Sequence, residues 1–252
     1  MKNNYNLVKL KNHYDSKGWV LLKQFVSKKD ALKIKNLIKA FLKKKIILNQ
    51  NSRSYNFVGN KNNLKNLNSF HELGKNKYIK KKANSVYIKK VVKKFLNSEV
   101  QYRYSELFAK PAKIGLPSPI HQDNFYWAVK GANALTVWVA LDKSNKKNGC
   151  IYYYDGSHKK GILSHKPSYA KGSSQTIKNK NQLKKFKISY PSLNVGDALI
   201  HNCLVVHGSS KNNSKKGRQG WTIQFKDKKA KYDIKQKKIY EKSLNKQIQM
   251  RS

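Results

Sequence analysis

The sequence predicts a fold that is mainly β with flanking helices, in a chain of 252 residues. Six short apolar or alternating runs in the second half have the length of strands, and turn-forming residues separate them. The first part instead places apolar residues at helical spacing. The 15 Tyr and 4 Trp supply large side chains for a core. We therefore predict one domain over residues 1–227, with a helical front part to about residue 97 and a β-barrel core over about residues 98–227.

The front part begins with a short strand, which the apolar run of residues 18–25 predicts. Ser27, with Asp30 three residues later, resembles a capping box that opens a helix. One face of this helix would carry apolar side chains at helical spacing: Ala31, Ile34, Leu37, Ile38, Phe41 and Leu42. A further helix is predicted from about Tyr78 to Leu96, with these residues facing inward: Ile79, Ala83, Val86, Val91 and Phe95.

The predicted strands of the core lie in the runs VQYRYSELFAK, PIHQDNFYWAV, ALTVWVALD, CIYYYDGSH, DALIHNCLVVH and QGWTIQF. Between them, segments such as NKKNG, DGSH and VGD provide the Gly, Asn and Asp that tight turns require. Residues 228–252 form a basic C-terminal tail with few apolar residues. We expect a surface helix or disorder in this tail.

The formal net charge of +43 raises the question of a polyanionic partner, because clustered cations attract nucleic acids and anionic membranes. Nearly all of this charge is lysine, spread through every segment, whereas base and phosphate recognition favours the guanidinium fork of arginine. The abundant Asn, Ile and Tyr are typical of a coding sequence rich in A and T, which explains the lysines by composition. We therefore expect no nucleic-acid partner, and we keep a polyanion-binding protein as the alternative function.

The N-terminal residues contain no apolar core of a signal peptide, and no apolar run reaches the roughly eighteen residues of a membrane span. The two cysteines, Cys150 and Cys203, suggest no disulfide framework, and Cys203 lies in an apolar run where a buried thiol is expected. We therefore expect a cytoplasmic protein without a membrane partner.

Two histidines and one aspartate form the candidate catalytic and metal-binding set. His121 and Asp123 are separated by one residue, so an extended strand would point both side chains to the same face. His207 follows 86 residues after His121, at the end of another apolar run, as a sheet that folds back on itself would require. Two imidazoles and one carboxylate that leave other positions open are the ligand preference of non-haem Fe(II) oxygenases.

Five other histidines compete with His207 for the third ligand position. Two of them, His13 and His71, lie in the helical front part, and His158 lies in a Gly-Ser turn. His165 and His201 remain, and His201 shares strand parity with His207. We expect His201 to be a hydrogen-bonding neighbour of the metal site rather than a ligand.

Arg218 lies 11 residues after His207, at the start of the run QGWTIQF. Its guanidinium could hold a dicarboxylic cosubstrate through two hydrogen bonds, in register with the metal. An ordinary arginine at a strand end is the alternative, but this chain uses lysine almost everywhere else. Ser209 could add a hydroxyl to the same carboxylate, or it could be a turn residue.

Residues 108–225 resemble the phytanoyl-CoA dioxygenase family of Fe(II)- and 2-oxoglutarate-dependent oxygenases. The segments that carry the resemblance are FAKPAKIGLPSPIHQDNFYW, VWVALDKSNKKNGCIYYYDGSHKKG and GDALIHNCLVVHGSSKNNSKKGRQGW, with the helical opening GWVLLKQFVSKKDALKIKNLI. The resemblance implies a double-stranded β-helix, which is a cupin-like jelly roll with the metal inside its mouth. It also implies that His121, Asp123 and His207 bind iron and that Arg218 and Ser209 bind 2-oxoglutarate.

Further residues take their expected roles from the same resemblance. Trp138 aligns with an aromatic residue that lines the cosubstrate pocket, and a core tryptophan is its alternative. The aromatic residues Phe125, Tyr126 and Trp127 would lie on the substrate side or in the core. Gln122 belongs to the HQD motif, and the strand alternation leaves its contact open. Asp155 replaces a proline that the family often has before the Gly-Ser-His turn, which should alter the turn and not the chemistry.

The expected reaction uses Fe(II), 2-oxoglutarate and O2 and releases succinate and CO2. Asp123 favours hydroxylation of a small molecule, because halogenases of the family replace this carboxylate with a small residue that admits chloride. A lysine-lined pocket mouth would suit an anionic or CoA-linked substrate. The alternative function is a basic nucleic-acid- or polyanion-binding protein on a catalytically silent barrel. The sequence carries no signal for an oligomeric state.

Overall fold

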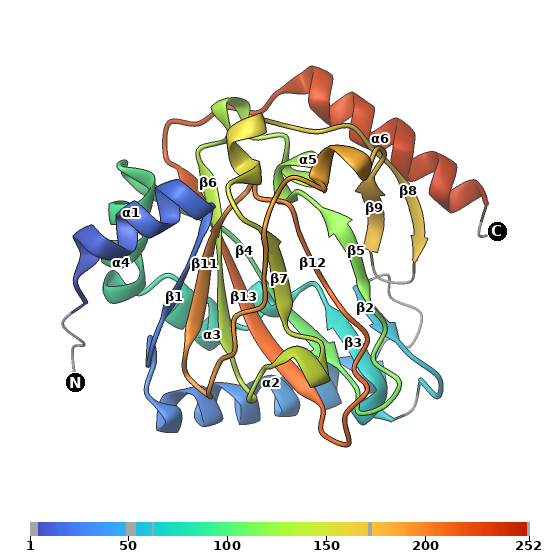
Figure 1. Cartoon of the computed structure of the whole chain (residues 1–252). Helices are drawn as coiled ribbons and strands as arrows, with labels where there is room; N and C mark the ends of the chain where they lie inside the picture. Colours follow the sequence, from blue (N-terminus) through green and yellow to red (C-terminus); the bar gives the residue numbers. More distant parts are fainter. Residues whose placement is uncertain (1–4, 49–53, 62, 171–172, 251–252) are drawn as a thin grey trace.

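Two antiparallel sheets form the centre of the computed structural model, which describes residues 5–48, 54–61, 63–170 and 173–250 (Figure 1). The larger sheet has the strand order β1-β11-β6-β13-β4-β3-β2, and the smaller has the order β10-β7-β12-β5. The central strands of the larger sheet are β4 (Val100–Lys110), β6 (Ala134–Ala140), β11 (Ala198–Asn202) and β13 (Arg218–Asp227). The smaller sheet consists of β5 (Ser118–His121), β7 (Ile151–Tyr154), β10 (Ile188–Ser189) and β12 (His207–Ser209).

The two sheets face one another across a buried apolar cluster. Trp138 and Leu199 of the larger sheet pack there with Ile151 and Tyr153 of the smaller. From β4 to β7, and again from β10 to β13, successive strands alternate between the two sheets. This alternation is the wrapping of a jelly roll, so the prediction of a mainly β protein with a double-stranded β-helix is confirmed.

Three strands extend the larger sheet from the front part of the chain. β1 (Trp19–Leu22) pairs with β11, as the apolar run predicts. β2 (Tyr55–Phe57) and β3 (Leu67–Phe70) pair with each other, and β3 pairs with β4. The expectation of a mainly helical front part therefore misses two strands, because both are too short and too rich in polar residues to show a clear alternation.

Four helices of the front part pack on the outer face of the larger sheet. They are α1 (Leu7–Lys17), α2 (Lys28–Leu48), α3 (Lys77–Ala83) and α4 (Val86–Leu96). The Ser27 hydroxyl accepts a hydrogen bond from the Asp30 backbone N–H at 3.0 Å, so the predicted start of α2 is confirmed. The main core cluster joins helical residues such as Ile38 and Val92 to Val137 and Ile223 of the sheet.

The single helix predicted from Tyr78 to Leu96 is wrong, because the chain breaks it in two. α3 ends at Ala83, and Ser85 begins α4 by accepting a hydrogen bond from the Ile88 backbone N–H at 3.4 Å. A serine side chain that satisfies a free N–H stabilises a helix start. Val86 follows this cap and is 84% exposed, so its predicted inward position is wrong as well.

The remaining elements lie around the open end of the barrel. α5 (Asp123–Trp127) follows β5, and the hairpin of β8 (His165–Ala170) and β9 (Ser173–Ile177) lies beside it. α6 (Ile234–Gln249) comes from the basic tail and contacts α5, β8 and β9, in agreement with the expected surface helix (Figure 1). Short 3₁₀ helices cover Leu64–Asn66, Leu73–Lys75, Lys130–Ala132, Lys146–Asn148, Ser157–Lys160 and Asn181–Leu183. None of the helices in the described residues is long and apolar enough to cross a membrane.

Candidate active site

His121 and His207 lie side by side on neighbouring strands of the smaller sheet. They are register partners of β5 and β12, and their ring centroids lie 4.3 Å apart. His121 Nδ1 lies 2.8 Å from the Pro119 carbonyl, and His207 Nδ1 lies 3.0 Å from the Val205 carbonyl. A carbonyl only accepts, so both Nδ1 atoms carry the proton and donate. Both Nε2 atoms are therefore left with a free lone pair.

Asp123 approaches the two histidines from the first turn of a helix. The expectation that it lies in the same strand as His121 is wrong, because β5 ends at His121 and α5 starts at Asp123. Gln122 between them is extended, so both side chains still point to the same side. Asp123 Oδ1 lies 3.6 Å from His121 Nε2 and 3.7 Å from His207 Nε2.

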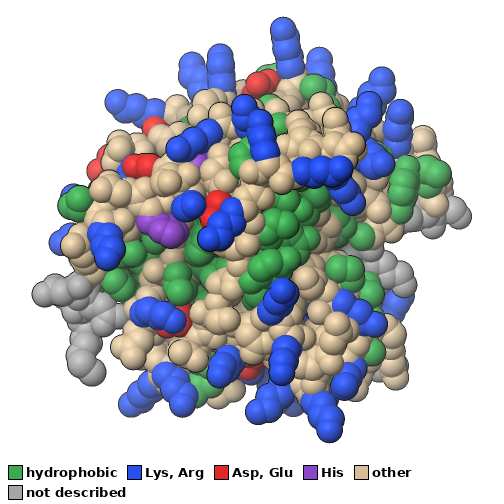
Figure 2. Space-filling view, viewed as in Figure 1, with side chains coloured by type: hydrophobic (Ala, Val, Ile, Leu, Met, Phe, Trp, Pro, Cys, Tyr) green, Lys and Arg blue, Asp and Glu red, His purple; other side chains and the backbone are tan. Residues whose placement is uncertain are grey.

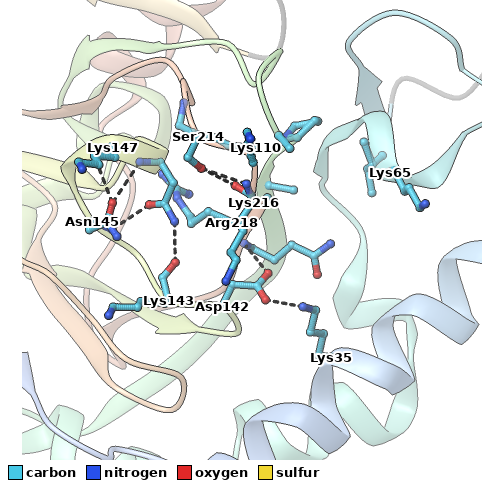
Figure 3. A pocket seen from close by; sticks show the side chains of 18 residues that line it. Lys35, Lys65, Lys110, Asp142, Lys143, Asn145, Lys147, Ser214, Lys216 and Arg218 are labelled. Carbon is cyan, nitrogen blue, oxygen red and sulfur yellow. Dashed lines mark hydrogen bonds and ion pairs between the residues drawn. The ribbon is translucent and has the colours of Figure 1, made fainter.

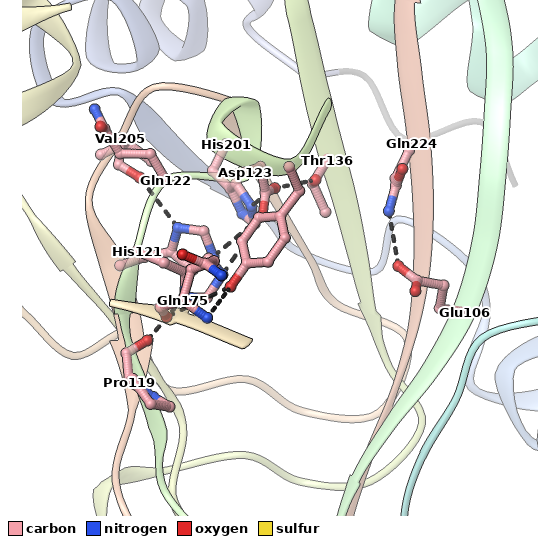
Figure 4. Close-up of polar contacts among 12 residues, drawn as sticks. Glu106, Pro119, His121, Gln122, Asp123, Thr136, Gln175, His201, Val205 and Gln224 are labelled. Carbon is pink, nitrogen blue, oxygen red and sulfur yellow. Dashed lines mark hydrogen bonds and ion pairs between the residues drawn. The ribbon is translucent and has the colours of Figure 1, made fainter. Parts of the chain in front are cut away.

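The second carboxylate oxygen of Asp123 is held by two donors (Figure 4). Thr136 Oγ1 donates to Oδ2 at 2.7 Å, and His201 Nε2 donates to it at 3.1 Å. His201 Nδ1 in turn lies 2.9 Å from the Tyr153 hydroxyl. These contacts confirm His201 as a hydrogen-bonding neighbour, and they orient Asp123 so that Oδ1 remains available.

The protonation states suit a cation at this place. Burial acts to raise the pKa of Asp123, but the adjacent imidazoles of His207, His121 and His201 outweigh it, so the pKa lies well below its usual value. Burial lowers the pKa of His207 to about 3, so this imidazole is neutral near pH 7. The three side chains each offer a ligand atom within 4.8 Å of the others, so the donor set fits a metal ion.

The predicted cosubstrate residues line the same cavity as the three candidate ligands. Arg218 opens β13 with 2% of its surface exposed, and its guanidinium carbon lies 5.0 Å above the ring of Trp138. Its Nη2 donates to the Gly149 carbonyl, whereas Nε is buried without a partner among the described residues. Burial lowers the pKa of Arg218 to about 10, so it stays charged at neutral pH. Ser209, at the end of β12, is also buried in this cavity.

Two glycines give Arg218 and Trp138 their positions. Gly149 has a φ of +76°, and a Cβ there would lie 2.4 Å from the Ser210 carbonyl oxygen. A Cβ on Gly220 would lie 1.9 Å from Trp138 Cζ2, so only glycine lets the indole cross β13 towards the guanidinium. The NKKNG segment was predicted as a turn, but nothing in the sequence assigned Gly220 this part.

A sequence model of the family described as "Phytanoyl-CoA dioxygenase (PhyH)" matches residues 14–220. The chain belongs to this family. The peroxisomal phytanoyl-CoA dioxygenase of Bos taurus is 21% identical over 243 residues, which cover 90% of this chain and 70% of that protein. The Mus musculus enzyme of the same name is 25% identical over 146 residues, which are 55% of this chain and 43% of that protein. The "Phytanoyl-CoA dioxygenase domain-containing protein 1" of Danio rerio is 29% identical over 151 residues, which are 58% of this chain and 51% of that protein. The matches to the Mus musculus and Danio rerio proteins therefore span about half of the length of each relative.

Several solved structures share the fold of this phytanoyl-CoA dioxygenase family member. The "non-heme alpha ketoglutarate dependent carbocyclase SnoK from nogalamycin biosynthesis" has a TM-score of 0.73 at 17% identity, covering 92% of this chain and 87% of that one. EctD from S. alaskensis has a TM-score of 0.74 at 17% identity, covering 92% and 82%. EvdO2 from Micromonospora carbonacea var. aurantiaca, solved with 2-oxoglutarate, has a TM-score of 0.65 at 17% identity, covering 90% and 92%.

The cavity that holds the three candidate ligands has a volume of about 820 Å³ and contains residues that the sequence did not single out; we call it the catalytic cavity, after its proposed role. Tyr126 and Trp127 line it, as expected of substrate-side residues. Phe125 instead stacks on His165 with ring centroids 4.1 Å apart. Gln122 is fully buried, and its side chain makes three hydrogen bonds to the backbone of Gly161, Leu163 and Leu204. The lining also includes residues from β2, β3, β4, β13 and α6, among them Asn56, Asn68, Glu106, Gln224, Tyr240, Leu244 and Ile248.

A second cleft, of about 710 Å³, shares Arg218 with the cavity of the candidate ligands, and seven of its 18 lining residues are lysines (Figure 3). We call it the basic cleft, and its lysines are Lys35, Lys65, Lys110, Lys143, Lys147, Lys215 and Lys216. Lys110 is 3% exposed and donates to the Leu116 carbonyl. Burial and the neighbouring Arg218 lower its pKa well below the usual value. Elsewhere, lysine and arginine side chains are spread over the visible face (Figure 2), as the compositional explanation of the charge requires.

Proposed function

We propose that this protein is an Fe(II)- and 2-oxoglutarate-dependent dioxygenase that hydroxylates a small molecule. The observation that carries the proposal is the convergence of His121 Nε2, His207 Nε2 and Asp123 Oδ1 in a cavity that also holds Arg218. Two solved neighbours of the same fold support the proposal, because SnoN was solved in complex with Fe3+ and alpha ketoglutarate, and EvdO2 with 2-oxoglutarate.

Each residue has a task that its contacts support. His121, Asp123 and His207 would hold the metal, while Thr136 and His201 keep Asp123 oriented. The Arg218 guanidinium and the Ser209 hydroxyl would bind the distal carboxylate of 2-oxoglutarate, with Trp138 as a wall beside it. When bound, iron and 2-oxoglutarate would supply the oxidation, in which O2 places one oxygen atom in succinate and one in the product alcohol, and CO2 leaves.

The metal assignment is tested by Asp123→Ala, with the exposed Asp15→Ala as the matched control. Calorimetric titration with Fe(II) under anaerobic conditions should show one site in the wild type and in Asp15→Ala, and none in Asp123→Ala. The reason is that Asp123 is the carboxylate of the three candidate ligands. Equal iron affinity in all three proteins would contradict the proposal.

The cosubstrate assignment is tested by Arg218→Ala. This variant should keep Fe(II) binding and raise the KM for 2-oxoglutarate roughly tenfold or more, because it loses a charge-assisted hydrogen bond. The measurement is succinate formation, which the wild type should support even slowly without a substrate. A wild-type protein that neither binds 2-oxoglutarate nor forms succinate across a broad substrate panel would sink the assignment.

Hydroxylation, as opposed to another oxidation, rests on the retained carboxylate of Asp123. The solved neighbours include a carbocyclase and an epimerase, so the fold supports several outcomes. Mass spectrometry of the product should show a gain of one oxygen atom that derives from O2. The expected cytoplasmic location stays a proposal, because relatives from four mammals are named peroxisomal.

The basic cleft supplies the observation that favours a second candidate, a polyanion-binding role. Its lysines lie around one cleft, where counterion release would favour an anionic polymer. Salt-dependent binding of DNA that survives Asp123→Ala but is lost in a Lys215→Glu/Lys216→Glu double variant would support this role. DNA binding that is absent at about physiological salt would exclude it.

A further inference from the structure

A row of polar side chains crosses the larger sheet from the candidate metal site on β6 towards β3, and its last three members are joined by hydrogen bonds. It begins with Thr136 on β6, which holds Asp123 and is the register partner of Gln224 on β13. Gln224 Nε2 donates to Glu106 Oε2 on β4 at 2.7 Å (Figure 4). His71, just beyond β3, donates from Nδ1 to Glu106 Oε1 at 2.6 Å. We call Thr136, Gln224, Glu106 and His71 the polar row, and all four line the catalytic cavity.

The orientation of the polar row is determined by a neighbour outside the cavity lining. Arg103 Nη1 donates to Gln224 Oε1 at 3.1 Å, so the amide nitrogen of Gln224 must face Glu106. Arg103 is itself held over the ring of Trp127, with its guanidinium carbon 4.7 Å from the centroid. Glu106 is 9% exposed and receives one donor on each carboxylate oxygen. A carboxylate accepts about four hydrogen bonds, so Glu106 retains capacity for donors from a ligand.

Two further polar atoms of the same wall lack partners among the described residues. Thr222 Oγ1, on β13 opposite Glu106 in the register, is buried without a hydrogen bond. Asn68 Oδ1, on β3, is in the same state. Both residues line the cavity, and a buried polar group without a partner is unfavourable unless a ligand satisfies it.

The opposite wall of the cavity is aromatic and aliphatic. Tyr126 of α5 and Tyr240 of α6 meet edge to face with centroids 5.4 Å apart, and Leu244 and Ile248 continue the wall along α6. α6 is held in place because Gln247 Oε1 accepts from the backbone N–H groups of Ser168 and Tyr169 at 3.1 and 3.2 Å. The tail that the sequence separates from the domain therefore forms one side of the cavity.

The charge of the cavity differs from the lysine-lined mouth that the sequence suggests. Among the described residues, the cavity lining includes no lysine, and the lysines gather in the basic cleft instead. Arg218 is the one arginine of this lining, and the proposed function assigns it to the cosubstrate. Glu106, a member of the polar row, is the one glutamate among these lining residues. A substrate phosphate or carboxylate would meet a carboxylate at this wall and no free cation.

We propose that the substrate presents hydrogen-bond donors, as an amine or a hydroxyl, to Glu106 and an apolar ring or chain to Tyr126, Tyr240 and Leu244. The substrate carries no phosphate or carboxylate at the end that meets the polar row. This excludes an acyl-CoA thioester that binds with its phosphates at the polar row. This inference rests on the proposed function, because it places the substrate beside the candidate metal site.

The test uses triplets of small molecules that share a ring skeleton and differ in one group, such as phenethylamine, 2-phenylethanol and phenylacetate. Binding is measured as the rise in Tm of the protein with Fe(II) and 2-oxoglutarate under anaerobic conditions, and coupling as succinate release in air. Amines or alcohols should raise Tm and stimulate succinate release, whereas the matching carboxylates and acyl-CoA thioesters should do neither. No difference between donors and carboxylates, or a preference for carboxylates, would overturn the proposal.

Two pairs of variants connect the preference to the named residues. Glu106→Gln should weaken amine binding roughly ten- to hundredfold, because it removes the negative charge, and it should weaken alcohol binding less. The matched control is Glu99→Gln, because Glu99 is exposed, and this variant should bind all probes like the wild type. Tyr240→Ala should weaken binding of every member of a triplet, and the 55% exposed Ile239→Ala is its control on the same helix. Equal affinities in Glu106→Gln and Glu99→Gln would overturn the role of Glu106. If the wild type does not bind 2-oxoglutarate when no probe is present, the proposed function itself is refuted.

Discussion

Replacing Gly220 by alanine should damage the cosubstrate site from within the sheet. The new Cβ would lie 1.9 Å from Trp138 Cζ2 and 2.0 Å from Cε2, whereas ordinary contact begins at 3.4 Å. The indole must therefore move by about 1.5 Å, or the two strands must separate by as much. Trp138 is 2% exposed and lies 5.0 Å from the Arg218 guanidinium, so its movement reaches the arginine.

Two magnitudes follow from this clash. Overpacking a core costs about 1–3 kcal/mol, which in a domain of this size lowers Tm by roughly 2–12 °C. Displacing Arg218 loses a charge-assisted hydrogen bond to 2-oxoglutarate, worth about 1.5–3 kcal/mol, so the KM for 2-oxoglutarate should rise roughly 10- to 100-fold. Fe(II) affinity should change little, because Gly220 is not among the residues that line the cavity.

The assay compares Gly220→Ala with Gly217→Ala by thermal unfolding and by succinate formation at varied 2-oxoglutarate. Gly217 is a matched control, because a Cβ there would meet its nearest atom at 3.5 Å, within ordinary contact. Trp138→Leu should partly restore the Tm of Gly220→Ala, so the two stability changes should be less than additive. A Gly220→Ala protein with the Tm and KM of Gly217→Ala, or strictly additive changes, would refute the reasoning.

Two further predictions concern stability. Burial lowers the pKa of His165 to about 4 in the folded state, against about 6.5 for an exposed histidine, so protonation favours unfolding. The free energy of unfolding of the wild type should include the full contribution of neutral His165 above pH 6.5 and fall by on the order of 3 kcal/mol as the pH drops to about 4. Urea titrations at several pH values should show that the free energy of unfolding of His165→Gln depends less on pH. Asp155→Ala should cost about 1–3 kcal/mol of unfolding free energy and leave the KM for 2-oxoglutarate unchanged, because Asp155 accepts from Trp19 Nε1 at 2.8 Å and Ser189 Oγ at 2.9 Å, away from the cavity. Chemical denaturation and succinate kinetics check this, and a normal stability with an altered KM would contradict it.

The motifs of the second half identified most of the candidate site. His121, Asp123, His207, Arg218 and Ser209 lie in one cavity, as residue type and spacing led us to expect. The order of short apolar runs predicted the barrel, and the confirmed membership of the family agrees with the quoted segments. The prediction that the strand continues through Asp123 was wrong. The spacing of apolar residues in one short run does not show where a strand ends and a short helix begins.

The polar row could not be predicted from sequence motifs in this way. Glu106, His71 and Gln224 lie far apart in the sequence and belong to no motif, so only the pairing of β3, β4 and β13 brings them together. α6 was recognised as a possible surface helix, but its contact with α5 depends on how the chain returns over the barrel mouth. Local periodicity carries no information on such long-range contacts.

The sequence by itself determined the strand pattern, the type of each candidate ligand and the choice of Arg218 as the candidate cosubstrate residue, because these depend on local spacing and side-chain chemistry. Only the tertiary structure decided which lysines surround a cleft, which glycine admits Trp138, and which polar groups meet at Glu106. Those features arise where strands distant in the chain become neighbours, and the register of their pairing decides which side chains share a wall.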